Sequence, residues 1–138
     1  MVIAYTTSSD GVDWIALKTD VAADHFDNGR TPAQMERSFR ASYRCVYARA
    51  GGRVVGTGRV LSDGVCNAYI VDMWTHSAHR RRGIGRRMLD VLCEGLEGQH
   101  VYLFTDDSEA FYAACGFVAR GAGLERVVGT WLRNVKPR

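Results

Sequence analysis

Asn67-Ala-Tyr-Ile-Val-Asp-Met-Trp-Thr75 leads into a second distinctive stretch, Arg80-Arg-Arg-Gly-Ile-Gly-Arg-Arg87. The first is a run of β-branched, aromatic and other apolar residues, which is typical of a buried strand. Beyond the second, apolar residues recur at spacings of three and four, which predicts a helix. These residues are Ile84, Met88, Val91, Leu92 and Leu96. The expected order is therefore strand, turn rich in glycine and arginine, helix.

This turn predicts a site for a ligand that carries two or three phosphate groups. At the start of a helix, unpaired backbone N–H groups and the positive end of the helix dipole point to one place. Gly83 and Gly85 let the backbone approach a ligand closely. Positive charge comes from Arg80, Arg81, Arg82, Arg86 and Arg87. The alternative is a solvated basic turn without a ligand.

Two common phosphate-binding loops are excluded by the sequence. No Gly-x-x-x-x-Gly-Lys-Ser/Thr run of a P-loop is present. The Gly-x-Gly-x-x-Gly/Ala fingerprint of dinucleotide-binding proteins also fails, because Met88 stands where its third small residue belongs. The ligand is therefore not predicted to be held by either loop.

Arg80-x-x-Gly83-x-Gly85 resembles the Gln/Arg-x-x-Gly-x-Gly/Ala signature of the GNAT superfamily of acyl-CoA-dependent N-acetyltransferases. Further along, Phe111-Tyr-Ala-Ala-Cys-Gly-Phe117 is similar to the Tyr-x-x-x-Gly-Phe motif near the end of the same fold. The two motifs follow each other in the family's order and at its usual spacing. Together they identify the chain as similar to GNAT acetyltransferases.

A narrower resemblance is carried by residues 62–72 and by Leu103-Phe104. These look like the small subgroup that contains plant serotonin N-acetyltransferase-like enzymes. The resemblance is good over residues 52–119 and poor over the first 40 residues.

The resemblance implies the GNAT fold, a mixed α/β fold of the α+β type. Its central twisted sheet has about six to seven strands, with helices on both faces, and the alternation of strand and helix patterns indicates the same arrangement. The strands near 66–75 and 100–104 are expected to run parallel and splay apart, leaving a wedge for the pantetheine arm of the cofactor.

The other elements follow from local patterns. Thr31-Pro32, with Gln34 three residues after the cap, predicts a helix start. Strands are expected at 2–6, 43–50, 53–61, 66–75, 100–104, 117–120 and 127–132. Helices are expected at 12–26, at 31–41, from the turn to about 97, and after a cap at 105–108 through 115.

Composition indicates one globular domain over residues 1–138, with 46% hydrophobic and 24% charged residues. No apolar run approaches the ~20 residues that a membrane span needs. The first residues, Met1-Val-Ile-Ala-Tyr5, do not resemble a signal peptide, so we expect a cytoplasmic protein without membrane contact. The four cysteines are widely spaced, which favours reduced thiols and no metal site.

Binding to nucleic acid is not predicted. The net charge is only +3, and its clearest concentration is the turn at residues 80–87. A nucleic-acid-binding domain would need a wider basic surface.

The resemblance implies acetyl-CoA as the acyl donor, with CoA as the product. Backbone N–H groups of residues 81–86 would bind the pyrophosphate, and Thr75 would pair with pantetheine like an added strand. Thr105 departs from the family, which often has asparagine there. The expected cofactor-binding residues are Met73, Trp74, Thr75, Arg80, Arg81, Arg82, Gly83, Ile84, Gly85, Arg86, Thr105, Ser108 and Phe111.

Tyr112 matches the family's usual general acid, which protonates the departing thiolate. The alternative is a core tyrosine on an amphipathic helix. Cys115 is interpreted as structural, because no partner base is evident from the sequence.

The general base is less clear, because Tyr69 occupies the position where several GNAT enzymes carry glutamate. We predict a catalytic role for Asp72, although a regular pleat would point it to the opposite face of the strand from Tyr69. His76 and a water chain are the alternatives.

The acceptor is expected to be a primary amine, either a small molecule or a protein lysine. The resemblance also implies that the chain can form a homodimer. Candidate acceptor-binding residues are the aromatic Phe26, Phe39, Tyr43, Tyr69 and Trp74 and the acidic Asp24, Asp27 and Glu36. A catalytically silent acyl-CoA sensor is the alternative function.

Overall fold

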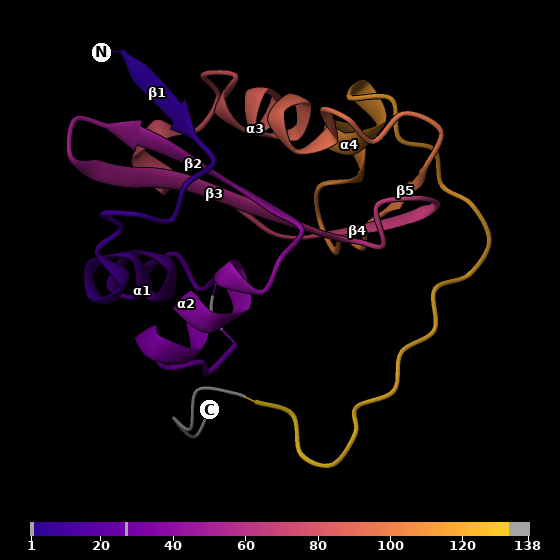
Figure 1. Ribbon diagram of the computed structural model, residues 1–138, viewed down its shortest axis with the longest axis horizontal. Helices are drawn as coiled ribbons and strands as arrows, with labels where there is room; N and C mark the ends of the chain where they lie inside the picture. Colours follow the sequence, from indigo (N-terminus) through magenta and orange to yellow (C-terminus); the bar gives the residue numbers. More distant parts are fainter. Residues whose placement is uncertain (1, 27, 133–138) are drawn as a thin grey trace.

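The computed structural model describes residues 2–26 and 28–132, and a five-stranded mixed sheet forms the centre of this part. From one edge to the other, β1 to β4 pair antiparallel and β5 joins β4 in parallel (Figure 1). The strands are β1 Ile3–Thr6, β2 Arg44–Ala50, β3 Arg53–Ser62, β4 Asn67–Thr75 and β5 His100–Tyr102. The predicted mixed α/β fold is confirmed, with fewer strands than the six to seven expected.

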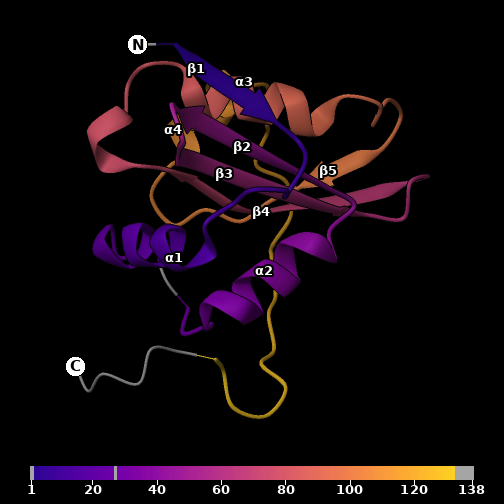
Figure 2. The same cartoon turned by 60° about the vertical axis from the view of Figure 1, so that its left-hand side comes forward.

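The helices cover both faces of the sheet, as predicted. Figures 1 and 2 show α1 and α2 on one face and α3 and α4 on the other. Within the described ranges, no helix is both long and apolar enough to cross a membrane. The helices are α1 Trp14–Ala23, α2 Pro32–Arg40, α3 Ile84–Cys93 and α4 Glu109–Ala114, and a 3-10 turn, η1, spans Ser77–His79.

Strand alternation divides the core between the two faces. Val46 and Ala48 of β2 belong to the cluster under α3, whereas Cys45 and Tyr47 belong to the cluster under α1 and α2. Since successive side chains of a strand point to opposite faces, the sheet contributes to both clusters. The second cluster is rich in aromatic residues, and the Phe39 ring lies 5.8 Å from that of Tyr47.

Hydrogen bonds at the helix ends explain where α2 begins and where α3 ends. Thr31 and Gln34 form the predicted capping box at the start of α2. In contrast, α3 ends at Cys93, earlier than the predicted end near residue 97. The Arg44 guanidinium from β2 donates to the carbonyl groups of Val91, Leu92 and Glu94, and the chain turns at Gly95 with φ 76°. A distant arginine therefore satisfies the helix end.

The strands predicted at 117–120 and 127–132 are wrong for the single chain. Residues 117–132 contain no assigned strand, and the later part of this stretch leaves the body as an extended path (Figure 1). Strand propensity reflects packing against neighbouring strands, so it does not ensure pairing without a partner.

The predicted parallel pairing of β4 with β5 is confirmed, and it is short. β4 and β5 are in register only from Asn67↔His100 to Tyr69↔Tyr102. β4 then continues to Thr75 without a β5 partner. The carboxyl half of β4 therefore has no strand neighbour on that side among the described residues.

Replacing Phe39 by alanine should destabilise the fold by about 3–5 kcal/mol, because the ring is almost fully buried between Trp14 and Tyr47. Urea unfolding would measure the loss. Ile15→Ala on the exposed side of α1 is the control and should cost less than about 1 kcal/mol. Equal effects would show that the aromatic cluster is not a stabilising core.

Candidate active site

A cavity of about 780 Å³ lies between the end of β4 and the starts of α3 and α4. The segment after α1 closes the rim of this cavity. It gathers most of the residues predicted to bind the cofactor, together with Tyr112. These are Met73, Trp74, Thr75, Arg80, Arg81, Gly83, Ile84, Gly85, Arg86, Ser108 and Phe111. Of the predicted set, Arg82 and Thr105 do not line this cavity, and Thr105 Oγ1 instead accepts from the Ser108 N–H at 3.0 Å.

The amino end of α3 is open toward this cavity. Gly83 is its N-cap with φ 78°, no side chain caps the helix, and its first turn contains no acidic residue. Arg81, just before it, is also left-handed with φ 63°. A Cβ atom at Gly85 would lie 3.1 Å from the Phe111 ring. Free helical N–H groups and a surface without side chains thus meet in one place, as an anion site requires.

Two arginines of the turn are oriented by contacts with the protein. Arg80 Nε donates to the Thr75 carbonyl at 3.1 Å, and its Nη2 lies 3.9 Å from the Asp24 carboxylate. Arg86 Nη1 donates to the Ala114 carbonyl at 3.2 Å, which ties α3 to α4. Their charges are therefore held at the rim of the cavity.

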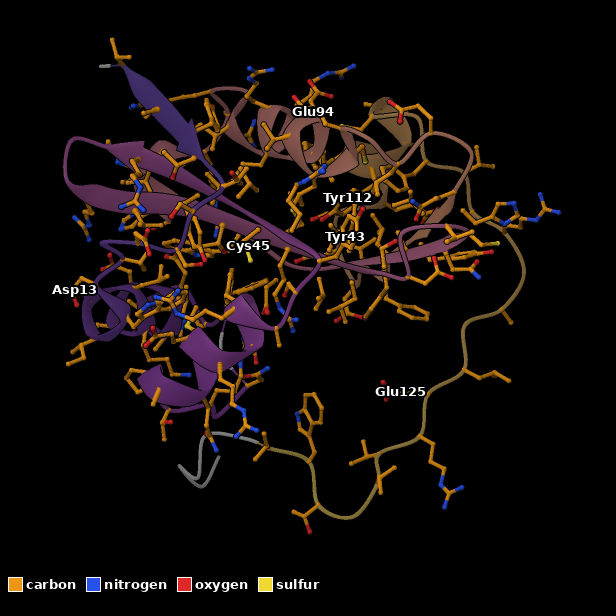
Figure 3. The ribbon with its side chains drawn as sticks, in the orientation of Figure 1. Asp13, Tyr43, Cys45, Glu94, Tyr112 and Glu125 are labelled. Carbon is orange, nitrogen blue, oxygen red and sulfur yellow. The ribbon has the colours of Figure 1, made fainter. Side chains whose placement is uncertain are left out.

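Tyr112 projects from α4 between this helix and the sheet (Figure 3). Its ring meets Phe111 and Phe117 edge to face, with centroids 5.0 and 5.8 Å away. Burial raises the pKa of Tyr112, and the charges of Cys115 and Asp107 raise it further. The phenol is consequently protonated at neutral pH and can act as a proton donor.

Asp72 lies at an irregularity in the middle of β4. Thr57 pairs with Trp74 and Arg59 with Val71, so Asp72 and Met73 together oppose only Gly58. Asp72 itself is left-handed, with φ 57°. The regular pleat assumed from the sequence is therefore interrupted at the residue predicted to be catalytic.

Two arginines neutralise the Asp72 carboxylate. Its Oδ1 accepts from Arg30 Nη2 at 2.8 Å, and its Oδ2 accepts from Arg30 Nη1 at 3.0 Å and Arg59 Nε at 2.5 Å. Burial alone would raise the pKa of Asp72, but the hydrogen bonds and charges of Arg30 and Arg59 outweigh it and lower the pKa. Asp72 does not line the cavity, and its role as a base stays a prediction.

Sequence reasoning did not assign roles to Arg30, Arg59 or His79. The two arginines stand far from Asp72 in the chain and form no local pattern with it. His79 directly precedes the Arg80 motif and lines the cavity, and its buried Nδ1 has no hydrogen-bond partner among the described residues. Burial, followed by the charge of Arg82, lowers the pKa of His79, so its ring is neutral at pH 7.

Three of the predicted acceptor residues, Asp24, Phe26 and Trp74, line the cavity. Asp24 Oδ2 accepts from Trp74 Nε1 at 3.0 Å and from the Ser77 N–H at 2.9 Å. Burial would raise the pKa of Asp24, but these hydrogen bonds and the charge of Arg80 lower it. Asp27 lies outside the described residues, and the candidates that lie outside the cavity are Phe39, Tyr43, Tyr69 and Glu36.

His76, the alternative base, is not among the residues that line the cavity. Its ring centroid is 5.7 Å from those of both Trp74 and His79. His76 Nδ1 accepts from the Ala78 N–H at 3.1 Å, and its Nε2 lies 3.3 Å from Arg53 Nη2. Both ring nitrogens thus have neighbours within the protein.

The model of the GNAT acetyltransferase family matches residues 13–117 of the chain. The chain belongs to this family. The matched range includes both motifs and the residues that line the cavity. GNAT acetyltransferases generally take the acyl group from acetyl-CoA and act on amine acceptors.

Solved structures of GNAT proteins resemble this one over nearly its whole length. A candidate acetyltransferase of the family from Xanthomonas campestris pv. campestris is 26% identical, with a TM-score of 0.79, covering 93% of this chain and 94% of its own. A candidate acetyltransferase from Deinococcus radiodurans R1 is 28% identical, with a TM-score of 0.79 and coverages of 90% and 87%. The comparison with curated protein sequences gives no match.

A more distant structure shares the fold alone. Glucosamine-6-phosphate N-acetyltransferase from Arabidopsis thaliana is 15% identical, with a TM-score of 0.69, covering 94% of this chain and 100% of its own.

Asp72→Asn should destabilise the protein by about 3–5 kcal/mol, because it leaves the charges of Arg30 and Arg59 buried without a counter-ion. Asp20→Asn is the matched control. It breaks an ion pair with the exposed Arg53 and should cost less than about 1 kcal/mol. Denaturant unfolding at pH 7 compares the two, and equal losses would contradict the structural importance of the Asp72 cluster.

The contribution of Asp72 should also depend on pH with a defined sign. Since folding lowers its pKa, the stabilisation is fully present above the ordinary carboxyl pKa of about 4 and is lost as the pH falls through the lower folded value. The stability difference between the wild type and Asp72→Asn should therefore shrink below about pH 4. A constant difference down to pH 2 would contradict this ionisation.

Proposed function

We propose that the chain is an N-acetyltransferase that moves the acetyl group of acetyl-CoA to a primary amine by direct attack in a ternary complex. The observation that carries the proposal is the single cavity that joins the uncapped amino end of α3 to the protonated phenol of Tyr112. The amino end of α3 suits the phosphates of an anionic carrier, and the phenol of Tyr112 suits a leaving group that needs a proton.

The residues of the cavity fit the cofactor of the family. The first N–H groups of α3 and the charges of Arg80 and Arg86 would hold the pyrophosphate. Beyond Tyr69, β4 has no β5 partner, so its backbone can pair with the amides of an extended arm. When bound, acetyl-CoA supplies a thioester carbonyl that an amine can attack.

Tyr112 would donate its Oη proton to the departing sulfur, which its raised pKa supports. An alkyl ammonium has a pKa near ~10.4, so the acceptor must also lose a proton before it attacks. Asp72 is the predicted base, but a carboxylate neutralised by two arginines is a weak proton acceptor. The neutral ring of His79 lines the cavity, and with water it offers the better route.

A small amine is the acceptor that we propose. The resemblance to serotonin N-acetyltransferase-like proteins supports it, and so does the place of Phe26 and the ionised Asp24 at the cavity. An aromatic ring and a carboxylate are suited to an amine with an apolar body. A protein lysine is the alternative acceptor.

A catalytically silent sensor of acyl-CoA is the second candidate function. It is favoured by the tyrosine at position 69, where several GNAT enzymes carry glutamate, and by the neutralised Asp72. Such a protein would bind CoA and acetyl-CoA without releasing thiol in the presence of amines.

Tyr112→Phe should lower kcat by about 10²–10⁴-fold and leave CoA affinity unchanged, because the variant keeps the ring and loses only the proton. Free-thiol release from acetyl-CoA would be measured with tryptamines, polyamines, aminoglycosides and lysine peptides, beside calorimetry with CoA. Tyr5→Phe on β1 is the control. Full turnover by Tyr112→Phe would show that Tyr112 does not donate the proton. If the wild-type protein bound CoA but acetylated none of the amines, the sensor function would be favoured.

Gly85→Val should weaken CoA binding by about tenfold or more, because the new side chain enters the space beside Phe111 and Thr75. Gly52→Val in the β2–β3 turn is the matched control, since a Cβ there meets no atom within 4 Å. Calorimetry with CoA would measure the affinity of both variants, and only Gly85→Val should bind more weakly. Unchanged affinity in Gly85→Val would show that the phosphates bind elsewhere.

A further inference from the structure

Three of the described residues other than glycine have a left-handed backbone, and one of them lacks an evident cause. They are His25 with φ 58°, Asp72 with φ 57° and Arg81 with φ 63°. Two arginines hold Asp72, and Arg81 belongs to the turn before α3. Both His25 and Arg81 line the candidate active site. A strained residue at a ligand cavity points to a function, because folding stability alone would favour a different residue there.

His25 stands directly after the end of α1, at a position where glycine is the usual residue. Asp24 is the C-cap of the helix. The His25 N–H donates to the Ala22 carbonyl at 3.0 Å, and the Phe26 N–H donates to the Val21 carbonyl at 2.8 Å. This pair of bonds defines a Schellman motif, whose left-handed residue is commonly glycine. Glycine would close the helix equally well without strain, so the need for an imidazole lies outside the helix cap.

The side chain of His25 is directed to the cavity rather than to the protein core. His25 is exposed, and its ring makes no hydrogen bond, ion pair or ring contact with the described residues. Asp24 and Phe26, on either side of it, line the same cavity. The side chain of Asp24 is only 10% exposed, and its pKa is lowered, so it is an anion at neutral pH. The rim thus presents a carboxylate, an imidazole and an aromatic ring from three consecutive residues.

An acceptor that enters as an ammonium must give up a proton, and the proton must finally reach solvent. His79 is neutral, but its Nδ1 is buried, so the route through His79 and water needs an outer group that exchanges protons with solvent. Arginine has no lone pair to accept a proton, and a carboxylate binds one less readily than an imidazole does. The other titratable and charged residues of the cavity are Asp24, Arg80, Arg81, Arg86, Asp107 and the protonated Tyr112.

We propose that His25 is the outer proton acceptor of the active site: its imidazole takes the proton that leaves the acceptor ammonium and releases it to solvent. An N–H bond of the ammonium breaks, its electron pair stays on the nitrogen for the attack, and the proton moves to the unprotonated ring nitrogen of His25. Asp24 attracts the ammonium to the same rim, and Tyr112 remains the proton donor to the sulfur. This role rests on the proposed acetyl transfer and supplies the outer end of its proton path.

The first test is His25→Asn, because asparagine tolerates the left-handed backbone and cannot accept the proton. With an amine that the wild type acetylates, kcat/KM should fall by about 10²-fold or more, and added free imidazole should restore part of the loss, since the rim is open to solvent. CoA affinity by calorimetry should not change. His100→Asn, at an exposed histidine of β5 outside the cavity, is the matched control and should keep full turnover.

The second test measures strain and does not need activity. His25→Gly should raise the midpoint of thermal unfolding by about 2–4 °C, because glycine adopts the left-handed backbone without cost. The same variant should lose turnover and regain part of it with imidazole. Ala16→Gly, at an exposed position within α1, is the matched control and should lower the midpoint, since there glycine only weakens the helix.

The possible failures are distinguishable. Full turnover by His25→Asn would overturn the proposal, and so would a loss that imidazole does not restore, which would assign His25 to binding or folding. A midpoint of His25→Gly at or below that of the wild type would remove the strain on which the inference is based. Wild-type protein that binds CoA and releases no thiol with any amine would overturn the proposed acetyl transfer itself, and the role of His25 with it.

Discussion

The carboxylate of Asp72, held between Arg30 and Arg59, is the contact on which the geometry of the site depends. It joins the segment before α2, strand β3 and the middle of β4. A left-handed backbone costs a residue with a side chain about 1–2 kcal/mol, and Asp72 adopts it with φ 57°. Buried ion pairs add little net stability compared with apolar packing. We therefore interpret the cluster as fixing a backbone shape.

The two ends of β4 have different neighbours. Asn67 to Tyr69 pair with β5 and complete the sheet. β5 ends at Tyr102, opposite Tyr69, so the rest of β4 has no β5 partner. Past the irregularity at Asp72, whose carbonyl accepts from Thr57 Oγ1 at 3.0 Å, β4 borders the cavity. A regular β4 paired along its whole length would leave no room beside it for an extended ligand. The irregularity at Asp72 lies in the pairing with β3 and comes directly before Met73, Trp74 and Thr75, which line the cavity.

Local patterns made much of the fold predictable, and distant contacts account for the rest. The capping box at Thr31 and the glycine turn before α3 depend on neighbours within a few residues, so the sequence showed them. The Arg30 and Arg59 contacts to Asp72 span 42 and 13 positions. The early end of α3 depends on Arg44 from β2. No local pattern reports such pairs, and strand propensity at 127–132 does not supply a neighbouring strand to pair with.

The groove beside β5 and the candidate active site share Tyr112. Burial is the main cause of the raised pKa of this phenol, so its protonation depends on what covers it. In the single chain, Phe104 next to this groove is largely exposed. The rings of Phe111 and Phe117, which meet the Tyr112 ring edge to face, supply part of this cover. Packing and the proposed acid catalysis are then connected through one side chain, because the contacts that bury the phenol also favour its protonated form.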